Sequence, residues 1–164
     1  RNVLDAGGQI AIVYPIVDDE EQEKRSVVAA YADWDRRFPG QVGMVHGQMK
    51  EQEKLDAVAA LKSGKKRIAI VSSVIEIGLT LGELRSLIVV NAERYGTSTL
   101  HQLRGRVARR GGTGYFFMFL PKTVKPDAMQ RLQLLVDHVD GFTLSEKDAE
   151  LRGYGDLFQD AEAV

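Results

Sequence analysis

The stretch HQLRGRVARR (residues 101–110) combines the residue types and spacing best suited to chemistry in this chain. On a helix of 3.6 residues per turn, Gln102, Arg106 and Arg109 fall on one face, with Gly105 beside them. Arginine presents a permanently charged fork of donors that fits phosphate oxygens, and a glycine leaves room for a phosphate to approach. The spacing predicts a helix that offers a phosphate-binding face. A solvated basic face with no ligand is the alternative interpretation.

A second face of the same expected helix is apolar. Leu100, Leu103 and Val107 recur at helical spacing, which indicates that they anchor the helix on a core.

Apolar runs that alternate with helical patterns predict the elements that position this segment. Expected strands cover residues 9–17, 42–45, 67–71, 84–90 and 115–120. Expected helices cover residues 18–38, 52–62, 126–139 and 144–151. This order is typical of an α/β fold with a mostly parallel sheet and helices on both faces, followed here by a helical hairpin and a loop.

Helical periodicity also predicts which side chains of these helices face the core. The expected inward positions are Val27, Tyr31, Trp34 and Phe38 in the first helix, Leu55, Val58 and Ala59 in the second, and Met129, Leu132, Leu135, Val136 and Val139 in the third.

Polar residues follow the expected strands where those strands end. His46-Gly47, Ser72-Ser73 and residues 91–95 each come directly after an apolar run. Ligands of parallel sheets gather at the carboxyl ends of the strands. We therefore expect these three stretches to share one edge of the sheet with the arginine segment.

Composition narrows the classes of function. The chain has 164 residues and a formal net charge of −1, so any nucleic-acid binding needs a local patch of positive charge. It has no cysteine, which excludes disulfides and thiolate metal sites. The histidines show no metal-ligand spacing, and we expect no metal site. No apolar run is long enough to span a membrane, and we expect a cytoplasmic protein. The first residue is not Met, so a piece of a longer protein is expected.

Several stretches together resemble the second motor domain of superfamily 2 helicases. Gln102-x-x-Gly105-Arg106-x-x-Arg109 resembles motif VI, residues 45–49 (VHGQM) resemble the VHGxM element, and residues 72–78 (SSVIEIG) resemble motif V. Residues 141–157 resemble the translocation motif that the RecG and transcription-repair coupling factor families share. The resemblance covers residues 9–157, and the spacing to His46 favours the RecG family.

The resemblance implies roles for particular residues. Arg106 and Arg109 would act on the phosphates of ATP as arginine fingers, and Gln102 would help to orient the catalytic site. The residues it assigns to ATP binding are Glu76, Gly78 and Gly105, and those it assigns to the DNA backbone are His46, Gly47, Ser72 and Ser73. Arg152 and Gly153 fall in the translocation motif, where Arg152 would hold the hairpin.

It also implies cofactors, partners and a division of the chain. ATP and Mg²⁺ would be bound mainly by a first motor domain that is absent here, because the chain has no P-loop. Expected partners are double-stranded and branched DNA, together with the first RecA-like domain and a wedge domain of the same protein.

Residues 1–124 would form the motor domain, whose parallel sheet would be RecA-like, and residues 125–164 the hairpin, translocation motif and tail. The full-length protein would be an ATP-dependent DNA helicase of the bacterial nucleoid-associated kind that acts in repair and recombination, and this piece alone would be inactive.

Two alternatives stay open at this point. The chain could be the equivalent domain of a coupling factor, or a degenerate helicase domain kept as a binding module. Two departures support the second alternative: Thr80 replaces the aspartate of motif V, and Ala108 replaces the usual glycine between the arginines. The second change is mild only if position 108 is helical.

Overall fold

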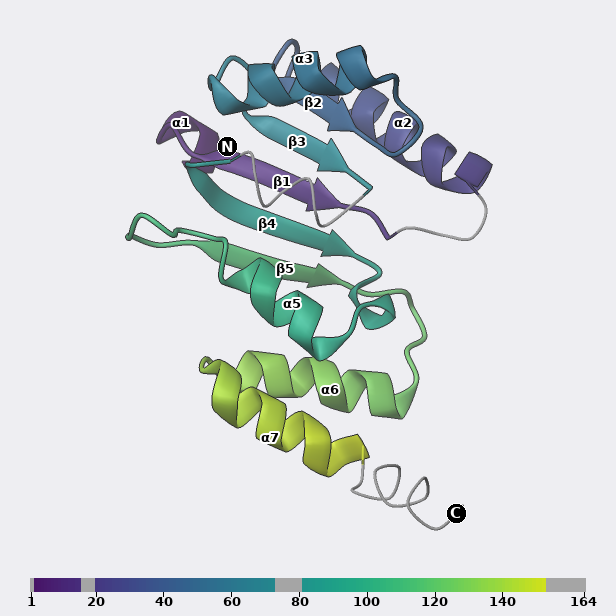
Figure 1. Cartoon of the computed structure of the whole chain (residues 1–164), viewed down its shortest axis with the longest axis vertical. Helices are drawn as coiled ribbons and strands as arrows, with labels where there is room; N and C mark the ends of the chain where they lie inside the picture. Colours follow the sequence, from purple (N-terminus) through teal and green to yellow (C-terminus); the bar gives the residue numbers. More distant parts are fainter. Residues whose placement is uncertain (1, 16–19, 73–80, 153–164) are drawn as a thin grey trace.

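The computed structural model describes residues 2–15, 20–72 and 81–152, which contain a five-stranded parallel sheet (Figure 1). The sheet order is β2-β3-β1-β4-β5, and every neighbouring pair runs parallel. The strands are β1 (Gln9–Val13), β2 (Val42–Val45), β3 (Ile68–Val71), β4 (Leu84–Val90) and β5 (Tyr115–Phe119). The prediction of a parallel α/β sheet is confirmed, and each strand lies within a predicted run, although the first strand ends at Val13, and Tyr14 and Pro15 are not part of it.

Helices cover both faces of this sheet. They are α1 (Asn2–Asp5), α2 (Glu20–Arg37), α3 (Glu51–Lys62), the 3-10 turn η1 (Ala92–Arg94), α5 (Thr97–Arg104), α6 (Pro126–Asp137) and α7 (Gly141–Arg152). The sequence pattern did not indicate α1 or η1. No helix of the described ranges is long and apolar enough to cross a membrane.

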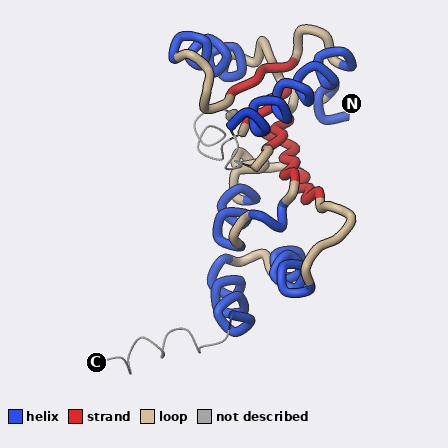
Figure 2. The backbone as a smooth tube through the Cα atoms, turned by 90° about the vertical axis from the view of Figure 1, so that its right-hand side faces the viewer, coloured by secondary structure: helices blue, strands red, loops and turns tan. Residues whose placement is uncertain are grey.

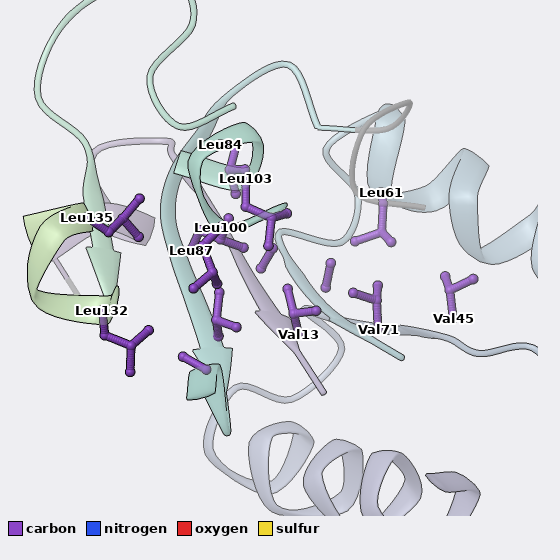
Figure 3. Close-up of a cluster of buried hydrophobic side chains, with 14 of the residues drawn as sticks. Val13, Val45, Leu61, Val71, Leu84, Leu87, Leu100, Leu103, Leu132 and Leu135 are labelled. Atoms are coloured by element: carbon purple, nitrogen blue, oxygen red, sulfur yellow. The ribbon is translucent and has the colours of Figure 1, made fainter. Parts of the chain in front are cut away.

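The larger core lies between the sheet and the helices α3 and α5 (Figure 3). Val13, Val71 and Leu87 point from the strands toward Leu61 of α3 and Leu103 of α5. Leu132 and Leu135 of α6 and Leu144 of α7 belong to the same cluster. The hairpin α6–α7 is therefore packed onto α5 as part of one hydrophobic core, at the opposite end of the molecule from α2 and α3 (Figure 2).

The opposite face of the sheet packs against α1 and α2. Val27 is fully buried there, and Tyr31, Trp34 and Phe38 pack around the same cluster, as the helical spacing predicts. The rings of Trp34 and Phe38 stack with their centroids 5.8 Å apart.

Two of the predicted inward faces are partly wrong. In α3, Leu55 is 55% exposed, and the buried anchor is instead Leu61. In α6, Leu132 and Leu135 are buried as expected, but Met129 and Val136 are 44% and 62% exposed, and Val139, which lies beyond the end of the helix, is 83% exposed. Alanines and leucines are spread around α3, so its apolar pattern does not single out one face. In α6 the neighbouring helices cover a narrower stripe than the apolar residues occupy.

Strand β5 lies at the edge of the sheet and has one uncovered face. Phe116 and Met118 pack against the larger core, whereas Tyr115, Phe117 and Phe119 alternate with them and are exposed. This alternation is expected for a strand that is buried on one side only.

Candidate functional site

The arginine segment is only partly helical. Helix α5 ends at Arg104, with Gly105 as its C-cap, so the prediction of a helix through Arg110 is wrong. Beyond Gly105 the chain turns, and Ala108 has a φ of +54°, in the left-handed region. The N–H of Ala108 donates to the carbonyl of Leu84 at 2.8 Å, which ties the loop to the start of β4. This attachment competes with helix continuation, and glycine at position 105 favours the helix weakly.

The apolar anchoring of the segment is as predicted. Leu100 and Leu103 are 1% and 0% exposed, and Val107 packs against the same cluster. Gln102 lies on the opposite, exposed side of α5.

The four arginines of the segment divide into two kinds. Arg104 donates to the carbonyl oxygens of Leu135 and Val139 at the end of α6, and its Nη2 lies 2.9 Å from His101 Nδ1. Burial lowers the pKa of the Arg104 guanidinium. Arg110 pairs with Glu83, with 2.6 Å between Nη1 and Oε1.

The side chains of Arg106 and Arg109, by contrast, have no hydrogen bond or ion pair with any residue that the structure describes. Arg109 is exposed and Arg106 is half-buried. They are the two arginines that the resemblance assigns to phosphate.

Arg109 lines an open pocket of about 670 Å³ at the amino edge of the sheet. Gly7 and Gln9 at the start of β1, Arg67 before β3 and residues 81–83 before β4 line it too. Gly105, Arg106 and Arg109 lie in the loop between α5 and β5, at this edge. The expectation that the arginine segment shares an edge with the carboxyl ends of the strands is therefore wrong. The reason is topological: a helix that joins two parallel strands must carry the chain back to the edge where the next strand begins.

The carboxyl edge holds the other predicted group. Val45 of β2 and Val71 of β3 are paired, so His46 and Ser72 follow side by side, and the N–H of Ser72 donates to the carbonyl of Val45 at 3.3 Å. Gly47 is exposed beside them, and Asn91 begins the η1 turn with a φ of 51°. The structure thus brings together His46, Gly47 and Ser72. Ser73, Glu76, Gly78 and Thr80 lie outside the described residues.

Burial at the carboxyl edge is unexpectedly deep. His46 is 5% and Ser72 is 2% exposed, and the Ser72 Oγ has no hydrogen-bond partner among the described residues. Burial, with the charge of Asp33 as a second cause, raises the pKa of Tyr14 at the end of β1. A contact between Ser72 and a DNA phosphate therefore needs this edge to open first.

The translocation residues are only partly described. Arg152 ends α7, and its side chain and Gly153 lie outside the described residues. The helix that leads to them is fixed on α5, because Thr97 Oγ1 donates to Asp148 Oδ1 at 2.7 Å.

Sequence reasoning missed the residues that hold the arginine loop and the hairpin in place, which are Thr97, Arg104, Glu83, Arg85 and Asp148. The contacts that attach the loop and the hairpin join residues 26 to 51 positions apart in the chain, so no local spacing could have revealed them.

The chemistry that this geometry supports is anion binding. The unpaired guanidinium of Arg109 lines an open pocket, and that of Arg106 extends from the same loop; both suit the phosphate groups of a nucleotide. Among the described residues no cluster of His, Asp and Glu could hold a metal ion, so a Mg²⁺ that accompanies such a nucleotide finds no ligand set in the described part of this chain.

Comparison with known proteins gives one family and consistent relatives. Residues 4–111 match the model of the helicase conserved C-terminal domain. The ATP-dependent DNA helicase RecG of Acidithiobacillus ferridurans is 36% identical over 99% of this chain and 24% of its own length. RecG of Haemophilus influenzae is 40% identical over 88% of this chain and 21% of its own length.

A solved structure agrees with these relatives. RecG bound to a three-way DNA junction superposes with a TM-score of 0.73 and 33% identity, over 93% of this chain and 20% of that one. The chain thus spans about a fifth to a quarter of the length of these relatives.

Proposed function

The chain belongs to the family of helicase conserved C-terminal domains, of which it is a RecG-type member, and on that premise we propose that it forms the second half of a DNA motor. The motor is an ATP-dependent translocase that remodels branched double-stranded DNA, such as replication forks and Holliday junctions, in repair and recombination. Its place of action is the compartment that holds the DNA, the bacterial cytoplasm. The boundary near residue 124, between motor domain and hairpin, is part of the proposal.

One observation carries the assignment of the ATP-facing edge. Of the arginines in residues 101–110, only Arg106 and Arg109 have no partner among the described residues, and Arg109 lines the amino-edge pocket. Both side chains bind phosphate oxygens and neutralise the charge that develops on them, while Gln102 and the backbone near Gly105 orient the site. ATP and Mg²⁺ are held mainly by a first motor domain in this proposal, since the sequence has no P-loop and the described residues contain no cluster of acids and histidines for a metal ion. Glu76 and Gly78 complete the nucleotide side of this proposal.

The carboxyl edge is assigned to DNA. The RecG structure with its three-way junction supports a branched-DNA substrate for this chain. His46, Gly47, Ser72 and Ser73 contact the phosphate backbone, which positions the duplex without reading its sequence.

The hairpin connects the two edges. Arg104 attaches α6 to the ATP-side end of α5, and Asp148 attaches α7 to the other end of α5. A shift of the arginine loop therefore moves the hairpin, and with it the segment of Arg152 and Gly153, against the DNA. The first motor domain and a wedge domain of the same polypeptide are the remaining partners.

The decisive experiment removes one of the two proposed arginine fingers, Arg109. The full-length protein, or this chain mixed with its first motor domain, is assayed for duplex-stimulated ATP hydrolysis with Arg109 and with Arg109→Ala. We expect a loss on the order of 10³-fold, the size typical of an arginine finger. Arg36→Ala, an exposed arginine of α2 that pairs with Asp33, is the matched control and leaves the rate unchanged.

Two results would overturn parts of the proposal. An unchanged rate in Arg109→Ala would leave a DNA-binding module without a motor role, the alternative that the positive φ of Ala108 favours. Measurable DNA-stimulated hydrolysis by the 164-residue chain alone would contradict the expected inactivity of the isolated piece.

A further inference from the structure

We propose that Glu83 is the positioning residue that holds the loop of Arg109 in place. Its carboxylate lies just before β4 and contacts two arginines. Oε1 accepts from Arg110 Nη1 at 2.6 Å, and Oε2 lies 3.8 Å from Arg85 Nη2. Arg85 in turn donates from Nη1 to the carbonyl of Gly111. The two contacts attach both residues that follow Arg109 to the start of one strand.

Glu83 is itself fixed to the core through Gln9, which is 5% exposed. The amide oxygen of Gln9 accepts from the N–H of Glu83 at 3.2 Å, and its nitrogen donates to the carbonyl of Leu61 at 2.8 Å. The backbone of Glu83 is thereby attached to β1 and to the end of α3. We call this set of contacts the brace: it links Gln9 at the buried start of β1 to Glu83, and Glu83 and Arg85 to Arg110 and Gly111.

The loop needs such a brace because its backbone is not favourable by itself. Ala108 occupies the left-handed region, which residues with a Cβ rarely adopt. The guanidinium of Arg110 lies against Gly82, where an added Cβ would be 3.4 Å from Nη2, an ordinary van der Waals distance.

The brace also keeps the carboxylate of Glu83 engaged with residues other than Arg109. The carboxylate of Glu83 lines the same pocket as Arg109, and it is occupied by Arg110 and Arg85. With those partners removed, the Glu83 carboxylate would be an unpaired negative charge in the same pocket, where it would attract Arg109 or repel a phosphate. The Glu83 and Arg110 side chains are 46% and 70% exposed, so the pair adds little to global stability, and its effect is local to the loop.

The first test measures the loop in the chain itself, by hydrogen exchange of the amides of Ala108 and Gly111. We expect Glu83→Ala to speed their exchange at least about threefold, while the melting temperature stays the same. Asp33→Ala, which removes another exposed ion pair at 3.3 Å, is the control and leaves these amides unchanged. Unchanged exchange in Glu83→Ala would overturn the brace.

The second test rests on the proposed function of Arg109 and uses the full-length protein. Glu83→Ala is expected to lower kcat for ATP about 3- to 10-fold with little change in KM, because a misplaced finger loses transition-state contacts. In an Arg109→Ala background the same change should have no further effect, since Glu83 acts through Arg109. Losses that simply add would overturn the positioning role.

The two tests separate the failure of the brace from the failure of the motor. If Arg109→Ala leaves hydrolysis unchanged, the proposed function falls, and the exchange rates alone still decide whether Glu83 holds the loop.

Discussion

At the amino edge of the sheet, Arg106 and Arg109 extend from a loop whose other arginines are all engaged, whereas at the carboxyl edge His46 and Ser72 are almost completely buried. The amino edge presents unpaired positive charge, and Arg109 lines an open pocket there. The second holds its polar groups beneath the surface. If the proposed function is right, this difference indicates that binding of the ATP phosphates needs little rearrangement of this domain, whereas contact with DNA at His46 and Ser72 needs more.

The largest expected effect comes from crowding the arginine loop. A Cβ on Gly114 would lie 2.4 Å from Val107 Cγ1 and 2.9 Å from the Cβ of Ala108, so Gly114→Ala must displace the loop. We expect the free energy of unfolding to fall by about 1–3 kcal/mol, measured by urea denaturation. Gly47→Ala at the carboxyl edge, where no atom lies within 4 Å, should stay within about 0.5 kcal/mol. Equal losses at both positions would remove the contrast between the edges.

The next effect distinguishes the two kinds of arginine. Arg104→Ala removes donors to the carbonyls of Leu135 and Val139, and we expect the hairpin to loosen with a loss of about 1–2 kcal/mol. Arg109→Ala should change stability by less than about 0.5 kcal/mol, because no described contact is lost. Thermal denaturation of both variants measures these losses of stability. A large loss of stability in Arg109→Ala would mean that Arg109 is a structural residue.

A smaller effect of opposite sign is expected at Ala108. Glycine tolerates a φ of +54°, so Ala108→Gly should stabilise the chain by about 0.5–1 kcal/mol. Ala59→Gly, at an exposed position of α3, should instead destabilise it by about 1 kcal/mol, since glycine is a poor helix former. Denaturation midpoints of the two variants should therefore move in opposite directions, and a loss for Ala108→Gly would refute the strain.

The smallest effect is at the carboxyl edge. Ser72→Ala removes a buried hydroxyl that has no described partner, so stability should stay within about 0.5 kcal/mol. Thr97→Val, which removes the 2.7 Å bond to Asp148, should lose about 1 kcal/mol. If Ser72 contacts DNA phosphates, Ser72→Ala still weakens duplex binding in a mobility-shift assay. Unchanged binding would remove Ser72 from the DNA path.

Most of the fold followed from local patterns. Apolar runs located all five described strands, and the stripe of Val27 and Trp34 located the core face of α2, because burial of a strand or a helix face leaves a periodic trace in the sequence. The order of the strands left no such trace. In α3 the apolar residues do not mark one face, so the pattern wrongly placed Leu55 in the core.

The candidate site was predictable in its residues but not in its arrangement. Spacing and resemblance singled out Arg106 and Arg109, yet the helix was expected to continue past Arg104 and to lie at the wrong edge. Its end depends on Ala108 bonding to Leu84, a contact across 24 residues. Engaged and free arginines look identical in sequence, because the difference lies in partners such as Glu83 and the carbonyl of Leu135.

The position of β1 has a consequence for the order in which the molecule assembles. Among the strands of this sheet β1 comes first in the chain but lies in the middle, where Ala11 pairs with Ala69 on one side and Leu87 on the other. At a synthesis rate of about 5–20 residues per second, Ala69 follows Ala11 by about 3–12 s and Leu87 follows it by about 4–15 s. The apolar strand QIAIV therefore gains its β3 neighbour before its β4 neighbour, and the centre of the sheet is complete only when translation is past β4.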